Sequence, residues 1–254
     1  MFGFLKKLLA GRSRPASFHG RTDTGRVRPH NEDSFCTLGN RSLFVVADGM
    51  GGHRAGEVAS RMAIEALIEF LTEERRQAAA GNSASSRRLL LDGFHHANQT
   101  VMKSAAANPT QRGMGCTMVA CLVDNATLHT CHVGDARCYL AHQGSLELIT
   151  TDHTGLSPVP GSSSTNGDTA QLRKVVTRAI GFPFPQEPEY HANPLRPGDR
   201  VLLCSDGLWN MLDQCRLEQI LLNATTADGA SKELINAANE EGGRDNITAL
   251  VLFY

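Results

Sequence analysis

The sequence predicts an α+β fold in which helices cover antiparallel sheets. Three observations carry this prediction. Apolar runs rich in Val and Leu, typical of buried strands, occur throughout the chain. Several of them follow one another through turns that are too short for a parallel crossover, such as Asp124-Asn125. Helical spacing falls in two pairs of segments, unlike the regular alternation of a doubly wound parallel sheet.

The N-terminal segment reads as a leader that precedes one folded domain. Residues 1–17 are expected to be disordered, because the amphipathic start is short and Lys6 and Lys7 interrupt it. Docking of this start on a membrane surface or a partner is the alternative. It lacks the features of a secretory signal, and no stretch reaches the ~20 apolar residues of a bilayer-spanning helix. The domain is expected over 18–254, in the cytoplasm and without stable membrane insertion.

Strands and helices follow from the periodicity of the apolar residues. The predicted strands are 33–38, 42–47, 115–123, 126–133, 136–141, 145–150, 200–205 and 246–253. The predicted helices, with apolar residues recurring every three or four positions, are 55–72, 84–107, 215–223 and 229–240. Residues 77–86 are expected to form a loop, and Pro158–Asp168, rich in Ser, Gly and Pro, a mobile one.

Composition excludes some classes of protein. With 254 residues, 41% apolar and 20% charged, the chain matches an ordinary globular enzyme. A net charge of −1 gives no electrostatic basis for nucleic-acid binding. The seven cysteines include no Cys-x-x-Cys pair and lie mostly in apolar runs, so buried free thiols are favoured over disulfides or zinc ligands.

Acidic residues stand where apolar runs begin or end. Asp48, Asp135 and Asp206 each follow such a run, and Asp245 precedes the last one. A carboxylate at the mouth of a buried strand is costly unless a positive charge meets it. If these carboxylates converge, they repel one another unless cations lie between them. The pattern therefore predicts hard divalent metal ions held by oxygen ligands.

Two dense clusters accompany these acids. The segment Arg28–Phe35 combines a guanidinium with the adjacent carboxylates Glu32 and Asp33. The segment Asp48–His53 holds glycines that let the backbone approach a ligand closely. Taken singly, an Asp-Gly pair is more often a turn, and adjacent acids are more often solvated. The interpretation as a site depends on the completeness and order of the whole set.

That ordered set resembles the metal-dependent type-2C protein Ser/Thr phosphatases, in their bacterial branch. The resemblance covers about 20–254. The matching stretches are Gly25–Asp33, Val46–Gly52, Gly115–Thr117, His132–Arg137, Thr150–His153, Thr177–Gly181, Cys204–Leu208 and Gly242–Thr248. It implies a four-layer α-β-β-α sandwich of two antiparallel sheets flanked by helix pairs.

The resemblance also implies two Mn²⁺ or Mg²⁺ ions, with a third, weaker site. The ligands that it implies are Glu32, Asp33, Asp48, Gly49, Asp135, Asp206 and Asp245. Among them, Asp48 would bridge the two ions, the Gly49 carbonyl would bind one, and Asp206 and Asp245 would hold the other. Glu32 and Asp33 would bind directly or through ordered waters, and Asp135 would support the third ion.

The implied chemistry is hydrolysis of phosphoserine and phosphothreonine on proteins by a water that the two ions activate. Arg28 would grip the phosphoryl oxygens, and Asp48 and Asp206 would complete the catalytic set. Many relatives carry a histidine where Met50 stands, which leaves His53, His153 or a water as the source of the leaving-group proton. For both histidines a structural role is favoured.

Phosphorylated proteins and a cognate Ser/Thr kinase are therefore the expected partners, with nucleic acid excluded. Two alternatives stay open. One is a phosphoprotein-binding module of the same fold that has lost its metals. The other is a regulatory phosphatase dedicated to a single signalling or secretion-system target. Trp209, which follows Asp206 closely, is expected in the core or the cleft wall.

Overall fold

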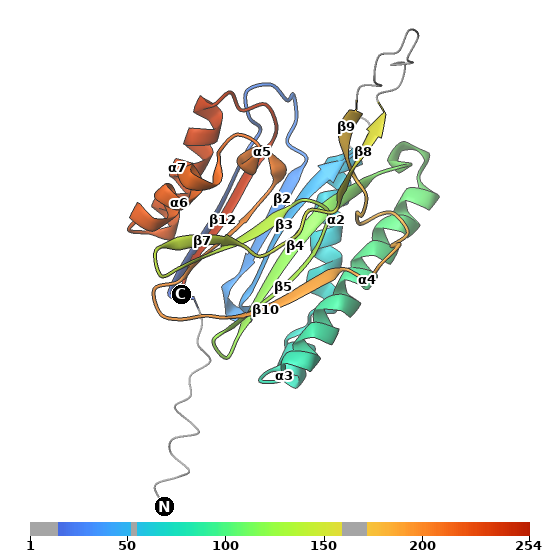
Figure 1. Cartoon of the computed structure of the whole chain (residues 1–254). Coiled ribbons are helices and arrows are strands. Elements are labelled where there is room, and N and C mark those ends of the chain that lie inside the picture. Colours follow the sequence, from blue (N-terminus) through green and yellow to red (C-terminus); the bar gives the residue numbers. More distant parts are fainter. Residues whose placement is uncertain (1–14, 52–54, 159–171) are drawn as a thin grey trace, which may run out of the picture.

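The protein is built around two five-stranded antiparallel sheets, packed face to face (Figure 1). The computed structural model describes residues 15–51, 55–158 and 172–254. In spatial order, the first sheet holds β1 (Ser17–Asp23), β12 (Ile247–Phe253), β11 (Arg200–Cys204), β6 (Arg137–His142) and β7 (Ser145–Leu148). The second sheet holds β10 (Glu189–Pro194), β5 (Thr127–Val133), β4 (Gly115–Asp124), β3 (Leu43–Met50) and β2 (Asp33–Leu38). A separate hairpin pairs β8 (Thr154–Pro158) with β9 (Leu172–Val176).

Helices cover the outer face of each sheet, which completes the four layers. The second sheet packs against α2 (Ala55–Phe70) and α4 (Ser83–Ala107), which form one hydrophobic cluster with it. The first sheet packs against α6 (Gln214–Asn223) and α7 (Ala227–Glu240) in another cluster. A third cluster fills the space between the sheets. The predicted α+β sandwich is therefore confirmed.

The alternation of side chains along the strands explains where polar groups enter the interior. On β3, Leu43 and Val45 face the helices, whereas Phe44 and Val46 lie between the sheets. Because successive side chains point to opposite faces, the next inward position after Val46 is Asp48. The inner face of the sandwich thus changes from apolar to acidic at one end of this strand.

The eight predicted strands are all present, but four others were not predicted. Two of these, β1 and β10, are outer strands of their sheets. Edge strands are partly solvated and need no continuous apolar run, so their sequences, Ser-Phe-His-Gly-Arg-Thr-Asp and Glu-Tyr-His-Ala-Asn-Pro, lack the signal of a buried strand. The other two form the β8–β9 hairpin, which stands outside both sheets.

One predicted loop is partly wrong. The first predicted helix ends at Phe70, and a short helix, α3 (Glu73–Ala79), occupies part of the expected loop 77–86. Thr72 caps α3 by accepting a hydrogen bond from the Arg75 N–H at 3.3 Å, and two glutamates follow in the first turn. This start signal was present in the sequence.

The expected start of the domain can be compared with the first described residues. Strand β1 begins at Ser17, one residue before the expected domain start, and the Ala16 N–H already bonds the Phe253 carbonyl at 2.7 Å. Most of the expected leader and of the expected mobile loop lie outside the described residues. In the part of the chain that the structure describes, helices of the length and apolarity needed to cross a bilayer are absent.

Candidate metal centre

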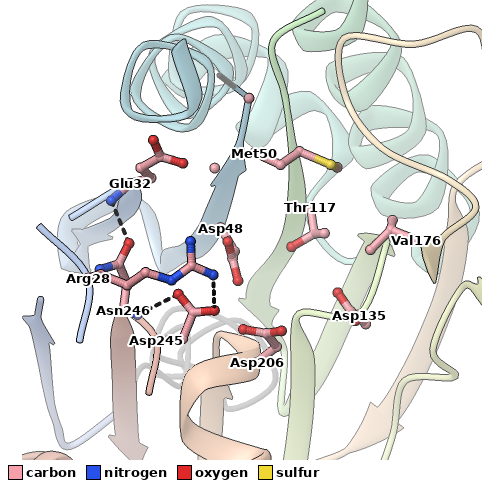
Figure 2. Close-up of a pocket in the computed structure, with 12 residues that line it drawn as sticks. Arg28, Glu32, Asp48, Met50, Thr117, Asp135, Val176, Asp206, Asp245 and Asn246 are labelled. Atoms are coloured by element: carbon pink, nitrogen blue, oxygen red, sulfur yellow. Dashed lines mark hydrogen bonds and ion pairs between the residues drawn. The ribbon is translucent and has the colours of Figure 1, made fainter. Parts of the chain in front are cut away.

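Most of the predicted site residues line one cavity of about 250 Å³ at the end of the sandwich where the inner faces become acidic. Figure 2 shows the carboxylates of Asp48, Asp206 and Asp245 turned toward one space, with Asp135 beyond them. The strand ends place them there: Asp48 lies on β3, Asp206 begins α5 (Asp206–Trp209) after β11, and Asp245 precedes β12. The cavity is also lined by Arg28, Glu32, Gly49, Met50, Gly51, Thr117, Val176 and Asn246.

Asp33 does not line the cavity but lies directly behind it. The register of β2, β3 and β4 places Asp33 opposite Asp48, and Asp48 opposite Thr117. The Oδ2 atom of Asp33 accepts hydrogen bonds from the hydroxyls of Ser205 and Thr248, both at 2.6 Å. Its Oδ1 atom is buried and makes no hydrogen bond within the described protein. Asp33 therefore keeps one oxygen free for a ligand.

Asn246 organises the segment that carries the arginine, a role that the sequence reasoning missed. Its Nδ2 donates to the carbonyls of Thr24 (2.9 Å) and His30 (2.8 Å), and its Oδ1 accepts from the Glu32 N–H (2.8 Å). Arg28 is held at the cavity by donating to Asp245 Oδ2 at 2.7 Å. The signal that could have found Asn246 is its position beside a predicted ligand at the start of a buried strand.

Close backbone packing beside the cavity depends on two glycines. A Cβ atom on Gly49 would lie 2.2 Å from the Gly56 carbonyl oxygen and 2.5 Å from that of Glu32. A Cβ on Gly56 would lie 2.3 Å from Glu32 Oε2. The two backbone oxygens leave no room for a Cβ at Gly49, and a Cβ at Gly56 would require the Glu32 carboxylate and the Gly49 carbonyl carbon, 2.9 Å away, to shift. This packing brings the Gly49 backbone and the Glu32 carboxylate to the same wall.

Burial and mutual repulsion raise the pKa values of this acidic set. Burial is the main cause for Asp48, whose pKa is raised well above its usual value, and repulsion from Asp33 comes next. Burial, followed by Asp135, raises the pKa of Asp206 to about 6. The pKa values of Glu32 and Asp135 are also raised, again chiefly by burial. The fully ionised pocket thus lacks sufficient positive charge of its own.

The residues present fit divalent cations. Besides Asp33 Oδ1, the buried hydroxyl of Thr117, which lines the cavity, makes no hydrogen bond within the described protein. Unsatisfied buried oxygens are costly, and here they accompany several carboxylates around a polar cavity. An all-oxygen donor set of this kind suits Mg²⁺ or Mn²⁺ rather than a softer metal.

The residues that line the cavity bear on which group supplies the proton to the leaving group. Met50 lines the cavity and carries no transferable proton. His153 does not line it, since its ring bonds Gly134 and Glu189 instead. His53 lies outside the described residues.

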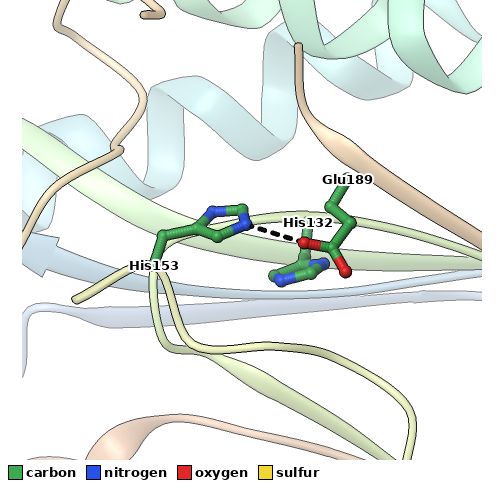
Figure 3. Close-up of side chains that lie close together, drawn as sticks. All are labelled: His132, His153 and Glu189. Atoms are coloured by element: carbon green, nitrogen blue, oxygen red, sulfur yellow. Dashed lines mark hydrogen bonds and ion pairs between the residues drawn. The ribbon is translucent and has the colours of Figure 1, made fainter. Parts of the chain in front are cut away.

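A second group of metal-type ligands, His132, His153 and Glu189, lies on the inner side of β5 and β10 (Figure 3). The Gly134 N–H donates to His153 Nδ1 at 3.2 Å, which leaves the proton of the neutral ring on Nε2, facing Glu189 Oε2 at 3.1 Å. A protonated Nε2 has no lone pair for a metal. This tautomer therefore makes His153 a hydrogen-bond donor rather than a ligand.

Two further features separate this histidine cluster from a metal site. The rings of His132 and His153 are stacked 4.6 Å apart at 17°, so their in-plane lone pairs do not converge. The Arg178 guanidinium lies 3.2 Å from His153 Nε2, where it would repel a cation. Burial, as the main cause, lowers the pKa of both histidines, to about 4 for His132, so the rings are neutral at pH 7. The favoured structural role of His153 agrees with this geometry.

Comparison with known proteins identifies the family. Residues 26–249 match the family model described as protein phosphatase 2C. The serine/threonine phosphatase stp of Listeria monocytogenes is 34% identical over 238 residues, which cover 91% of this chain and 93% of that protein. The serine/threonine protein phosphatase PstP of Mycobacterium tuberculosis is also 34% identical, over 92% of this chain and 44% of its own length.

Solved structures agree with the sequence comparison. The catalytic domain of PstP, solved in complex with two manganese ions, matches with a TM-score of 0.75 and 30% identity, covering 93% of this chain and 97% of that one. PppA of Pseudomonas aeruginosa, described as a key regulatory component of a type VI secretion system (T6SS), matches with a TM-score of 0.76 and 28% identity over 95% and 99%. The chain therefore belongs to the protein phosphatase 2C family and is a bacterial-type serine/threonine phosphatase, a hydrolase.

Proposed function

We propose that this protein hydrolyses phosphoserine and phosphothreonine on proteins with two divalent ions, Mn²⁺ or Mg²⁺, and so opposes a Ser/Thr kinase in the cytoplasm. The observation that carries the proposal is the convergence of Asp48, Asp206 and Asp245 around one cavity that also holds Arg28. When bound, the ions supply an activated water and neutralise phosphoryl charge.

The protein's own groups position the substrate and the ions. Asp48, Asp206, Asp245 and the Gly49 carbonyl are the proposed direct ligands, with Glu32 and Asp33 supporting them and Asp135 facing a third ion. Arg28 is partly exposed at the cavity, and only one edge of its guanidinium is committed to Asp245. Its remaining N–H groups make no hydrogen bond within the described residues and can donate to phosphoryl oxygens, which favours the charge that develops in phosphoryl transfer.

A metal-free phosphoprotein-binding module is disfavoured by the charge of the pocket. Without cations, a phosphate dianion would enter a cavity lined by Glu32 and four aspartates, where Arg28 is the one positively charged residue among the described lining residues. Like charges at such distances repel strongly in a partly buried site. The same fold could bind phosphate tightly only after the acidic residues had been replaced or neutralised.

A regulatory phosphatase dedicated to one target is the second candidate. The likeness to PppA, which is described as a regulatory component of a secretion system, favours it, whereas the likeness to stp and PstP fits a broader role equally well. Phosphoproteomes from cells with and without the gene would separate them, since a dedicated enzyme changes the occupancy of one site or a few.

The activity is tested by hydrolysis of a phosphothreonine peptide in Mn²⁺, in Mg²⁺ and after exhaustive chelation. We expect release of phosphate that depends on added metal and that returns when metal is restored. Inhibitors of Cys-dependent phosphatases should have no effect, since the mechanism uses no thiol. Full turnover in chelator would contradict the proposed mechanism while leaving the family assignment intact.

A further inference from the structure

Lys174 on β9 extends its ammonium group toward the acidic centre. Its Nζ atom lies 3.0 Å from Asp152 Oδ2 and 4.0 Å from Asp135 Oδ2. It also lies 4.3 Å from the centroid of the Trp209 ring, and the indole N–H donates to the Asp135 carbonyl at 3.0 Å. Two carboxylates and an aromatic face thus hold the amine in one place.

Lys174 donates a hydrogen bond to Asp152 Oδ2, but that carboxylate has a second basic partner. Arg137 already grips that carboxylate with two hydrogen bonds, from Nε to Oδ1 at 2.8 Å and from Nη2 to Oδ2 at 2.9 Å. Asp135, in contrast, has Lys174 as its single ion-pair partner within the described part of the chain. The ammonium therefore lies between Asp152, which Arg137 also neutralises, and Asp135, whose side chain is only 9% exposed.

Asp135 faces the cavity from the side opposite to Arg28 (Figure 2). The unpartnered hydroxyl of Thr117 lies on the same wall. Lys174 Nζ, 4.0 Å from Asp135 Oδ2, places a positive charge beside this carboxylate. The carboxylate is thus stabilised in its ionised form by a protein amine at the place where a cation would otherwise do so.

We propose that Lys174 is a built-in competitor for a further divalent cation at Asp135 and Asp206, so that this end of the pocket holds such an ion only weakly. The inference rests on the proposed two-ion function and adds a residue that no ligand motif contains. An ion that approaches Asp135 must displace or repel the ammonium. By linkage, the ion and the amine weaken each other's hold on the carboxylate equally.

The test counts Mn²⁺ bound to the metal-depleted full chain, by the electron paramagnetic resonance signal of free Mn²⁺, in wild type, K174M and K174R. K174M should bind one further equivalent with a dissociation constant lowered about tenfold or more, because a unit charge near 4 Å is removed from a partly buried site. K174R, which keeps the charge, should resemble wild type. K103M, on the exposed surface of α4, is the matched control.

The location of the additional Mn²⁺ ion is tested by adding D135N to K174M. The double variant should lose the further equivalent that K174M binds. In wild type, labelling of the Lys174 amine, 45% exposed, should increase at millimolar Mn²⁺, a readout that does not depend on any variant. Two tight equivalents in every chain, with no gain in K174M and unchanged labelling, would overturn this inference alone. Absence of Mn²⁺ binding in all chains would overturn the proposed function and this inference with it.

Discussion

Two groups of metal-type side chains, the acidic pocket around Asp48 and the histidine cluster around His132, each include residues of the second sheet, and they differ in how their polar atoms are satisfied. In the acidic pocket, Asp33 Oδ1 and the Thr117 hydroxyl lack partners, and the carboxylates outnumber the cations. In the histidine cluster, Glu189 accepts from His153 at 3.1 Å and from His191 at 2.9 Å. The acidic pocket lacks positive charge, whereas nearly all ring nitrogens and carboxylate oxygens of the histidine cluster have hydrogen-bond partners.

The difference shows that ligand identity alone does not make a metal site. Free lone pairs and uncompensated negative charge do, because an ion must gain more from its ligands than it loses by dehydration. Within the described residues, His132 Nδ1 is the one ring nitrogen of the histidine cluster without a hydrogen-bond partner. Three measurements test this contrast between the acidic pocket and the histidine cluster.

The largest effect is expected for D206N. Asparagine keeps the size of the side chain but removes the charge that holds an ion, so kcat/KM for a phosphopeptide in Mn²⁺ should fall by about 10³-fold or more. The Mn²⁺-induced rise in Tm should shrink in parallel. The matched control is D92N, on a partly exposed face of α4 where Asp92 pairs with Arg88 at 2.8 Å. Activity in D206N comparable to that of D92N would contradict the assignment of the pocket.

The pH dependence of stability is the second test. In chelator, the folded acidic pocket retains protons that the unfolded chain has released, because burial raises the pKa of Asp206 to about 6 and that of Asp33 to about 7. Its contribution to the free energy of unfolding therefore falls as pH rises from about 4 to about 7, by roughly 1–3 kcal/mol for groups that titrate together. Mn²⁺ should stabilise the protein more at pH 7.5 than at pH 5.

The histidine cluster makes the stability of the fold depend on pH in the opposite direction. Its buried rings have lowered pKa values, so the unfolded chain binds more protons as pH falls below the usual histidine value, and stability decreases toward acid. Urea unfolding of wild type and D206N across pH 5–8 in chelator separates the contribution of the acidic pocket to stability from that of the histidine cluster. The slope of the free energy of unfolding against pH should be more positive in D206N than in wild type. Identical slopes would show that the acidic pocket does not retain protons.

The smallest effect is expected for E189Q. Glutamine offers one carbonyl oxygen where Glu189 serves two histidines, so one hydrogen bond is lost and the free energy of unfolding should fall by about 1 kcal/mol. The Mn²⁺ dissociation constants should not change, because the histidine cluster holds no ion. H95N, which breaks the exposed His95–Glu187 pair at 2.9 Å, is the control and should cost less. A weaker Mn²⁺ site in E189Q would show that the two regions are coupled.

Sequence reasoning found the strands with an apolar inner face and missed those without one. Every residue that it proposed for the metal centre, except Asp33, lines the cavity. Asn246, Lys174 and Asp152 were not singled out, because their roles depend on partners far along the chain: Asn246 bonds Thr24 and His30, and Lys174 meets Asp135. No periodicity or local motif records such a meeting.

By itself, the sequence determined the alternation that buries one face of each strand and the placement of acids where those strands begin or end. Both are local properties of the chain, set by side-chain period and by the cost of an uncompensated charge. Only the tertiary structure decided which oxygens stay free, which carboxylate lies behind the cavity, and that an amine from the β8–β9 hairpin reaches Asp135. These depend on strand register and on distances between segments distant in sequence, which packing alone sets.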